Sequence, residues 1–170
     1  MEYRIDKMVS DDWDQVRSIY LDGIVTGNAT FESKAPDWDN WDSSHMPECR
    51  LVARASNTIL GWAALSPISS RCVYSGVAEI SVYVATKHQR LGVGGKLLAA
   101  LIEASEKNGI WTLQAGLFPE NIDSINLHKR YGFRHVGRME KLSKMTYGQH
   151  KGAWRDVVLM ERRSKSVGID

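Results

Sequence analysis

A strand, a glycine-containing turn and an amphipathic helix follow one another in residues 77–109, and this order constrains the fold more than any other feature. Residues 77–85 are rich in β-branched and aromatic side chains, which favour a strand. Residues 89–95 contain three glycines and indicate a turn. Apolar residues then recur at helical spacing up to the stop signal Asn108-Gly109, at Val93, Leu97, Leu98, Leu101 and Ile102. The sequence therefore predicts that a helix packs one apolar face against a sheet.

The residues before this unit predict two helices, one of them short, and three strands. Ser10 is the expected N-cap of a helix whose apolar face carries Trp13, Val16, Ile19 and Tyr20. A polar, aromatic stretch at residues 28–47 indicates a loop with a short helix. The strands are expected at residues 3–6, 50–55 and 59–65, with the last two forming an antiparallel hairpin.

The residues after it continue the alternation of strands and helices. We expect strands at residues 112–118, 133–139 and 154–160, a helix at 121–131 and a long loop at 144–154. The strands are first antiparallel and then joined through helices, which is a mixed α/β order. A chain of 170 residues has room for one domain with a substantial core. We place that domain at residues 1–163 and a C-terminal tail at 164–170.

Composition and charge exclude several classes of protein. The 22 basic and 20 acidic residues are scattered, so no basic run marks a nucleic-acid surface. Cys49 and Cys72 have no metal-ligand spacing, and no metal is expected. No apolar stretch approaches the roughly 20 residues that cross a bilayer, and the N-terminus lacks an apolar signal core. We therefore expect a cytoplasmic protein without a membrane or nucleic-acid partner.

The turn at residues 89–95 is a candidate anion site. Unpaired backbone N–H groups at the start of a helix can hold a pyrophosphate, and glycines let the backbone come close to it. Arg90 and Lys96 would add positive charge. The turn lacks the Gly-Lys-Ser/Thr ending of a P-loop and the full dinucleotide fingerprint. Taken alone, it is explained equally well as a tight strand-to-helix connection.

Two motifs resemble the GNAT acetyltransferase superfamily. Gln89, Gly92 and Gly94 match its Gln/Arg-x-x-Gly-x-Gly/Ala motif directly after a central strand. Asn121, Ser124 and the ending Tyr131-Gly132-Phe133 match a second segment. The resemblance covers the second half of the chain closely and the first half by its order of elements. It implies the GNAT fold, in which helices flank a mixed, mostly antiparallel central sheet.

The resemblance also implies that acetyl-CoA is the cosubstrate. The backbone of Val82, Tyr83 and Val84 would pair with the pantetheine arm. Asn121 and Ser124 would contact the cofactor. The pyrophosphate would lie at the turn and the start of the helix, formed by Gln89, Arg90, Leu91, Gly92, Val93, Gly94, Gly95 and Lys96.

A closer resemblance is to the phosphinothricin and methionine sulfoximine acetyltransferase branch. It rests on residues 78–84, residues 88–92, Leu127-His128 and the ending Gly148-x-x-x-Gly152-x-Trp154-x-Asp156. In that branch the strand glutamate is the proposed general base, and Glu79 occupies its place. A carboxylate could deprotonate the amine, which is mostly charged at neutral pH. Without the resemblance, Glu79 would be read as a solvated or ion-paired strand carboxylate.

His128 stands where many members of the superfamily have a tyrosine that is proposed to protonate the departing thiolate. A histidine could donate the proton only when charged, whereas a thiol with pKa of about 8.5 can leave without a strong acid. We expect a moderate contribution from His128 through orientation or proton exchange. A histidine packed on a helix face is the alternative.

Arg71 and Tyr74 precede the catalytic strand in a loop. The planar fork of Arg71 suits a substrate carboxylate, and Phe31 and Tyr74 would shape the side-chain pocket. An arginine in water is the alternative for Arg71. We expect transfer to the α-amine of a small amino acid such as methionine sulfoximine, methionine sulfone or phosphinothricin. A polyamine, a protein or peptide amine, or a coenzyme A sensor without turnover remain alternatives. The resemblance implies a homodimer.

Overall fold

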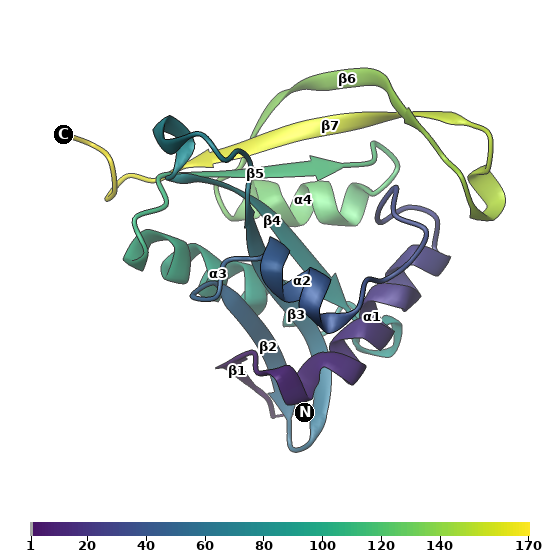
Figure 1. Cartoon of the computed structure of the whole chain (residues 1–170), viewed down its shortest axis with the longest axis horizontal. Coiled ribbons are helices and arrows are strands. Elements are labelled where there is room, and N and C mark those ends of the chain that lie inside the picture. The colour runs from purple at the N-terminus through teal and green to yellow at the C-terminus, as the bar shows by residue number, and fades with distance from the viewer. Residues whose placement is uncertain (1) are drawn as a thin grey trace.

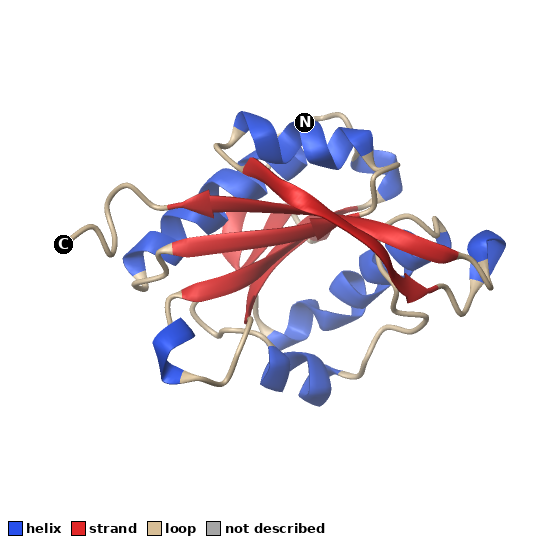
Figure 2. Cartoon of the chain, turned by 90° about the horizontal axis from the view of Figure 1, so that it is seen from above, coloured by secondary structure: helices blue, strands red, loops and turns tan. Residues whose placement is uncertain are grey.

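A seven-stranded sheet with helices on both faces forms the protein in the computed structural model, which describes residues 2–170 (Figures 1 and 2). The strand order is β1-β2-β3-β4-β5-β7-β6, and only β4 and β5 pair in parallel. This confirms the predicted α/β class and the mixed, mostly antiparallel sheet. The strands are β1 (Arg4–Lys7), β2 (Arg50–Ala55), β3 (Thr58–Pro67), β4 (Val77–Val84), β5 (Thr112–Leu117), β6 (Arg134–Lys144) and β7 (Trp154–Arg163).

Two helices cover each face of the sheet. The α-helices are α1 (Trp13–Val25), α2 (Trp38–Ser44), α3 (Val93–Lys107) and α4 (Ile122–Arg130). Four short 3-10 helices lie in the connecting segments: η1 (Ser10–Asp12), η2 (Cys72–Tyr74), η3 (Thr86–His88) and η4 (Gly148–His150). The predicted apolar face of α3 packs into the larger core, and α4 adds side chains to it. An aromatic core under α1 and α2 lies on the opposite face of β3 and β4.

Strand β4 divides its side chains between these two cores. Ala78 and Ile80 are buried in the core under α3, and Tyr83 packs against the aromatic core under α1 and α2. Successive side chains of a strand point to opposite faces, so Glu79 and Ser81 share the face of Tyr83. This face looks toward α1 and the loop that follows it.

The sheet splits between β4 and β5. Their parallel pairing is limited to Val77–Glu79 with Thr112–Gln114, and the rest of β5 pairs only with β7. The backbone edge of residues 80–84 therefore has no strand partner on this side. Figure 1 shows the two strands diverging from a common start.

Two sequence-based predictions about element ends are wrong. Ser10 does not cap α1 but lies in the 3-10 turn before it, where the Asp12 carboxylate accepts from the Val9 N–H at 3.0 Å. The strand expected at 133–139 continues to Lys144, because register shifts let it bend past Lys141 without leaving β7. The Lys141 N–H donates to the Asp156 carboxylate at 2.7 Å across this irregularity.

Among residues 2–170, no helix combines the length and the apolar character that crossing a membrane requires. The same residues contain no group of three or more His, Cys, Asp or Glu side chains placed to bind a metal ion.

Candidate functional site

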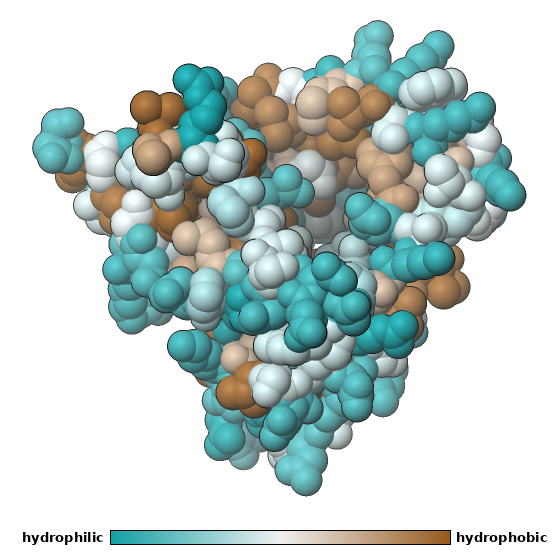
Figure 3. All heavy atoms as spheres, viewed as in Figure 1, coloured by the Kyte–Doolittle hydropathy of each residue, from teal (hydrophilic) through white to brown (hydrophobic). Residues whose placement is uncertain are grey.

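A cleft of about 1420 Å³ opens where β4 and β5 separate. Its walls come from β4, β5, the start of α3, α4 and the loop after α1. Figure 3 shows the molecule hollowed near its middle, with a mostly apolar upper rim and a mostly polar lower rim. Eighteen residues between positions 31 and 128 were predicted as site residues, and fourteen of them line this cleft.

The turn before α3 leaves its backbone donors free. Gly92 adopts the left-handed conformation, with φ of 80°, and no side chain caps the helix that begins at Val93. The first N–H groups of α3 therefore have no partner in the helix and can hold an anion. Gln89, Arg90, Gly94 and Gly95 line the cleft together with Gly92 and Val93. The geometry fits a pyrophosphate.

Two residues of the predicted anion site lie elsewhere. Leu91 is exposed and does not line the cleft. The Lys96 ammonium lies 4.5 Å from the centre of the Tyr3 ring, which it contacts as a cation over an aromatic face. Packing also favours glycine at position 95, because an added Cβ would lie 2.8 Å from the Tyr131 hydroxyl.

The free edge of β4 lines the cleft opposite this turn. Val82, Tyr83 and Val84 line the cleft, and their backbone faces the gap that the split leaves. An extended amide-containing chain could bond to such an edge as a strand would. Asn121 and Ser124 lie across the gap, and the Asn121 carboxamide caps α4 by accepting from the Ser124 N–H at 3.3 Å.

Glu79 lines the cleft at the point where the sheet splits. It stands opposite Ser66 of β3 and Gln114 of β5, and it forms no ion pair with the residues that the structure describes. Glu79 is exposed at the open mouth of the cleft, and partial desolvation by the cleft walls raises the pKa of its carboxyl. An ion-paired structural role is therefore absent for Glu79 within residues 2–170.

His128 is buried beside the cleft, with 3% of its surface exposed. Its Nδ1 lies 2.7 Å from the carbonyl oxygen of Ser124. A carbonyl only accepts, so Nδ1 carries a proton and Nε2 is the nitrogen whose protonation can change. Burial lowers the pKa of His128, which favours the neutral ring. The ring also packs edge-on against Phe133 at 5.0 Å, so packing and a position at the cleft coexist.

The loop between α1 and α2 forms the wall that faces Glu79. Residues 28–32 of this loop line the cleft, Phe31 among them. The Phe31 ring meets the Phe118 ring edge-to-face at a distance of 4.9 Å. Tyr20 of α1 extends this wall, packing against Tyr83 at 5.0 Å.

Arg71 and Tyr74 lie outside the cleft lining, on the exposed η2 segment between β3 and β4. The Arg71 guanidinium stands 5.4 Å from the centre of the Tyr74 ring. Sequence reasoning missed many of the lining residues, among them Tyr20, Glu32 and Ser81. The alternation of β4 would have identified Ser81, because it shares a face with Glu79.

Comparisons with known proteins point to one family. The sequence model of the acetyltransferase (GNAT) family matches residues 13–133. A phosphinothricin N-acetyltransferase of Streptomyces coelicolor is 36% identical over 107 residues, which are 63% of this chain and 60% of that protein. An L-methionine sulfoximine/L-methionine sulfone acetyltransferase of Pseudomonas aeruginosa is 30% identical over 152 residues, 86% of each chain. The protein yncA of Salmonella typhimurium, solved with its cofactor acetyl-CoA, superposes with a TM-score of 0.85 at 25% identity, covering 100% of this chain and 99% of that one.

Proposed function

The chain belongs to the acetyltransferase (GNAT) family and is an acetyl-CoA-dependent N-acetyltransferase, and from this premise we propose that its acceptor is the α-amine of a small amino acid. Methionine sulfoximine, methionine sulfone and phosphinothricin are the acceptors that its relatives' names indicate. The amine attacks directly, with both substrates bound together. Cys49 is buried and has a pKa raised to about 11, so it offers no thiolate for a covalent route.

The residues of the cleft divide the work of binding acetyl-CoA. The N–H groups at the start of α3 hold the pyrophosphate, and Arg90 adds charge beside them. The free edge of β4 pairs with the pantetheine arm at Val82 and Val84. When bound, acetyl-CoA supplies the acetyl group as an activated thioester.

We assign Glu79 as the general base, and its position in the cleft is the main observation that supports the proposal. The carboxylate lies at the split of the sheet, unpaired, and its raised pKa makes it a better proton acceptor than an ordinary glutamate. An amino acid's ammonium group must lose a proton before it can attack. Glu79 accepts that proton directly or through one water.

His128 orients its surroundings in this proposal rather than acting as an acid. Its Nδ1–H is committed to the Ser124 carbonyl, and its lowered pKa leaves Nε2 unprotonated at neutral pH. An unprotonated nitrogen accepts a hydrogen bond and cannot give a proton. The thiol of the leaving group, with pKa of about 8.5, does not need a strong acid.

Phe31 shapes the acceptor pocket from the cleft wall, whereas Arg71 and Tyr74 lie outside the cleft lining and can act on the acceptor only from its border. Phe31 forms the wall opposite Glu79. Arg71 forms no ion pair with the described residues, so its guanidinium is available for a carboxylate. Exposed apolar residues surround it, with Val73 67% and Ile68 38% exposed. We propose that a second copy of the chain covers this segment in a homodimer and that Arg71 acts at the resulting border.

A polyamine is the second candidate acceptor, and the charge of the cleft favours it. The lining carries four carboxylates and two arginines, and of the carboxylates only Glu32 and Glu79 form no ion pair with the described residues. Two carboxylates would attract a polycation more strongly than a zwitterion.

Release of free thiol from acetyl-CoA tests these proposals on purified protein. The panel is methionine sulfone, methionine sulfoximine, phosphinothricin, spermidine and a short peptide. Turnover on the first three alone supports the amino-acid acceptor. Turnover only on spermidine or the peptide contradicts it, and binding of acetyl-CoA without turnover on any of the five would favour a sensor.

A further inference from the structure

Arg155 of β7 is a buried charge that the reaction does not use. Only 5% of the residue is exposed. Its guanidinium donates to the Gly27 carbonyl at 2.5 Å, the Asn28 side-chain oxygen at 2.7 Å and the Glu120 carboxylate at 3.1 Å. The same group lies 3.8 Å from the centre of the Phe118 ring. Two of the three acceptors belong to the loop between α1 and α2.

A buried guanidinium is stable only where several oxygens replace its water. The Glu120 carboxylate only weakly stabilises the charge of Arg155, because 61% of the Glu120 side chain is exposed and water screens the ion pair. The two loop oxygens are therefore major partners of the charge, in hydrogen bonds of the charge-assisted kind. The loop cannot move away without leaving Arg155 unpaired.

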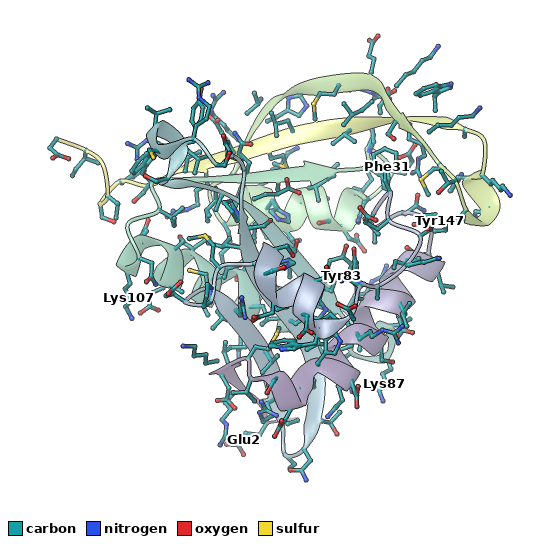
Figure 4. All side chains as sticks on the ribbon, in the orientation of Figure 1. Glu2, Phe31, Tyr83, Lys87, Lys107 and Tyr147 are labelled. Atoms are coloured by element: carbon teal, nitrogen blue, oxygen red, sulfur yellow. The ribbon has the colours of Figure 1, made fainter. Side chains whose placement is uncertain are left out.

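Other side chains from the second half of the chain contact the same loop. The Asn121 amide donates to the Asn28 carbonyl at 3.3 Å, and the Tyr147 hydroxyl donates to the Thr30 carbonyl at 2.7 Å. Figure 4 shows Phe31 and Tyr147 converging at one end of the β5–β7 region. Arg155 is the only charged donor to this loop among the described residues, and it makes two bonds there.

The anchored loop is the wall of the cleft that faces Glu79. Asn28, Thr30 and Phe31 line the cleft from this loop. In contrast, the start of α3 and the edge of β4 make no hydrogen bond to Arg155. Its loss would therefore disturb the acceptor wall and leave those two parts of the cofactor site in place.

We propose that Arg155 is a positioning residue that fixes the loop at residues 27–31 against Glu79 and thereby sets the affinity for the acceptor. It acts through Gly27 and Asn28 and does not touch the reacting atoms. The inference rests on the proposed function, because the loop is an acceptor wall only if an acceptor binds beside Glu79.

The kinetic test compares Arg155→Met with Arg155→Lys and with a control, Arg138→Met. Arg138 lies on the neighbouring strand, 55% exposed, and pairs with Asp156 without contacting the loop. Arg155→Met should raise KM for the acceptor about tenfold, the equivalent of one charge-assisted hydrogen bond, with KM for acetyl-CoA unchanged. Arg155→Lys should recover part of that loss, and the control should match the wild type. Equal changes in both KM values would overturn the proposal.

Hydrogen exchange gives a readout that needs no acceptor. Backbone amides at residues 26–32 should exchange faster in Arg155→Met than in the wild type, while amides at residues 93–100 keep their rates. Asn28→Ala removes one loop acceptor without emptying a buried site, and it should loosen the same segment if Arg155→Met folds poorly. Unchanged exchange in both variants would refute the positioning role. If the wild type turns over no amino acid, the proposed acceptor fails while this exchange result still decides the role of Arg155.

Discussion

Replacing Glu79 with glutamine removes its basicity and nearly preserves its shape. The side chain forms no ion pair with the described residues, so no buried cation is left unpaired and the fold should persist. General bases contribute about 10²- to 10⁴-fold to rate, and we expect kcat to fall at least about 100-fold. KM for acetyl-CoA should stay close to the wild-type value, because Glu79 is not among the predicted cofactor contacts.

The raised pKa of Glu79 also predicts opposite effects on rate and stability. Desolvation disfavours the charged carboxylate in the folded state. The unfolded chain therefore ionises first, and stability falls as pH rises from the ordinary carboxyl pKa through the raised one. Over the same window the wild-type rate should rise, because Glu79 becomes able to accept a proton. Glu79→Gln should lose both dependences and gain stability relative to the wild type above the window.

The assay is thiol release at saturating acetyl-CoA between pH 4.5 and 9, with urea unfolding measured at the same pH values. Glu32→Gln is the matched control, since Glu32 is a second carboxylate of the same cleft. An equal loss of kcat in both variants would assign the effect to the charge of the cleft instead of to one base. A kcat for Glu79→Gln within about threefold of the wild type would remove Glu79 from the mechanism altogether.

Three further predictions concern His128, Arg71 and Gly23. His128→Asn should lower kcat less than about tenfold and leave the shape of the pH–rate profile unchanged, because burial lowers the pKa of the wild-type ring and favours its neutral form. If the variant instead lost one arm of the pH–rate profile, His128 would act as the general acid. Arg71→Ala should raise KM for an amino acid about tenfold and leave KM for spermidine unchanged, and equal effects on both would remove the carboxylate clamp. In Gly23→Ala the new Cβ would lie 2.8 Å from the Tyr83 ring, so a packing cost of about 1–3 kcal/mol should outweigh a helix-propensity gain of about 1 kcal/mol. Urea unfolding checks the last prediction, and a more stable variant would contradict it.

Local patterns predicted the parts of the site whose chemistry is local. The turn at residues 89–95 could be predicted from sequence, because glycines spaced in this way after a strand indicate a tight turn whose backbone can approach an anion closely. Glu79 was found through resemblance, since a lone carboxylate in a strand has no local signal. The role that we propose for Arg155 could not be predicted, because its partners in the loop lie 127 and 128 positions away and nothing near it in the sequence marks a buried charge.

The division of roles that we propose for β4 follows from the split in the sheet. A strand offers two kinds of contact: its backbone edge lies in the plane of the sheet, and its side chains point above and below that plane. Pairing with β5 ends at Glu79, so the edge from residue 80 onward is free for the cofactor. The side chains of Glu79 and Ser81 meanwhile face the loop after α1. One strand can thus hold a cofactor by its edge and an acceptor by its face, and the two meet where pairing ends. This geometry makes Glu79 the residue of β4 best placed to act on both.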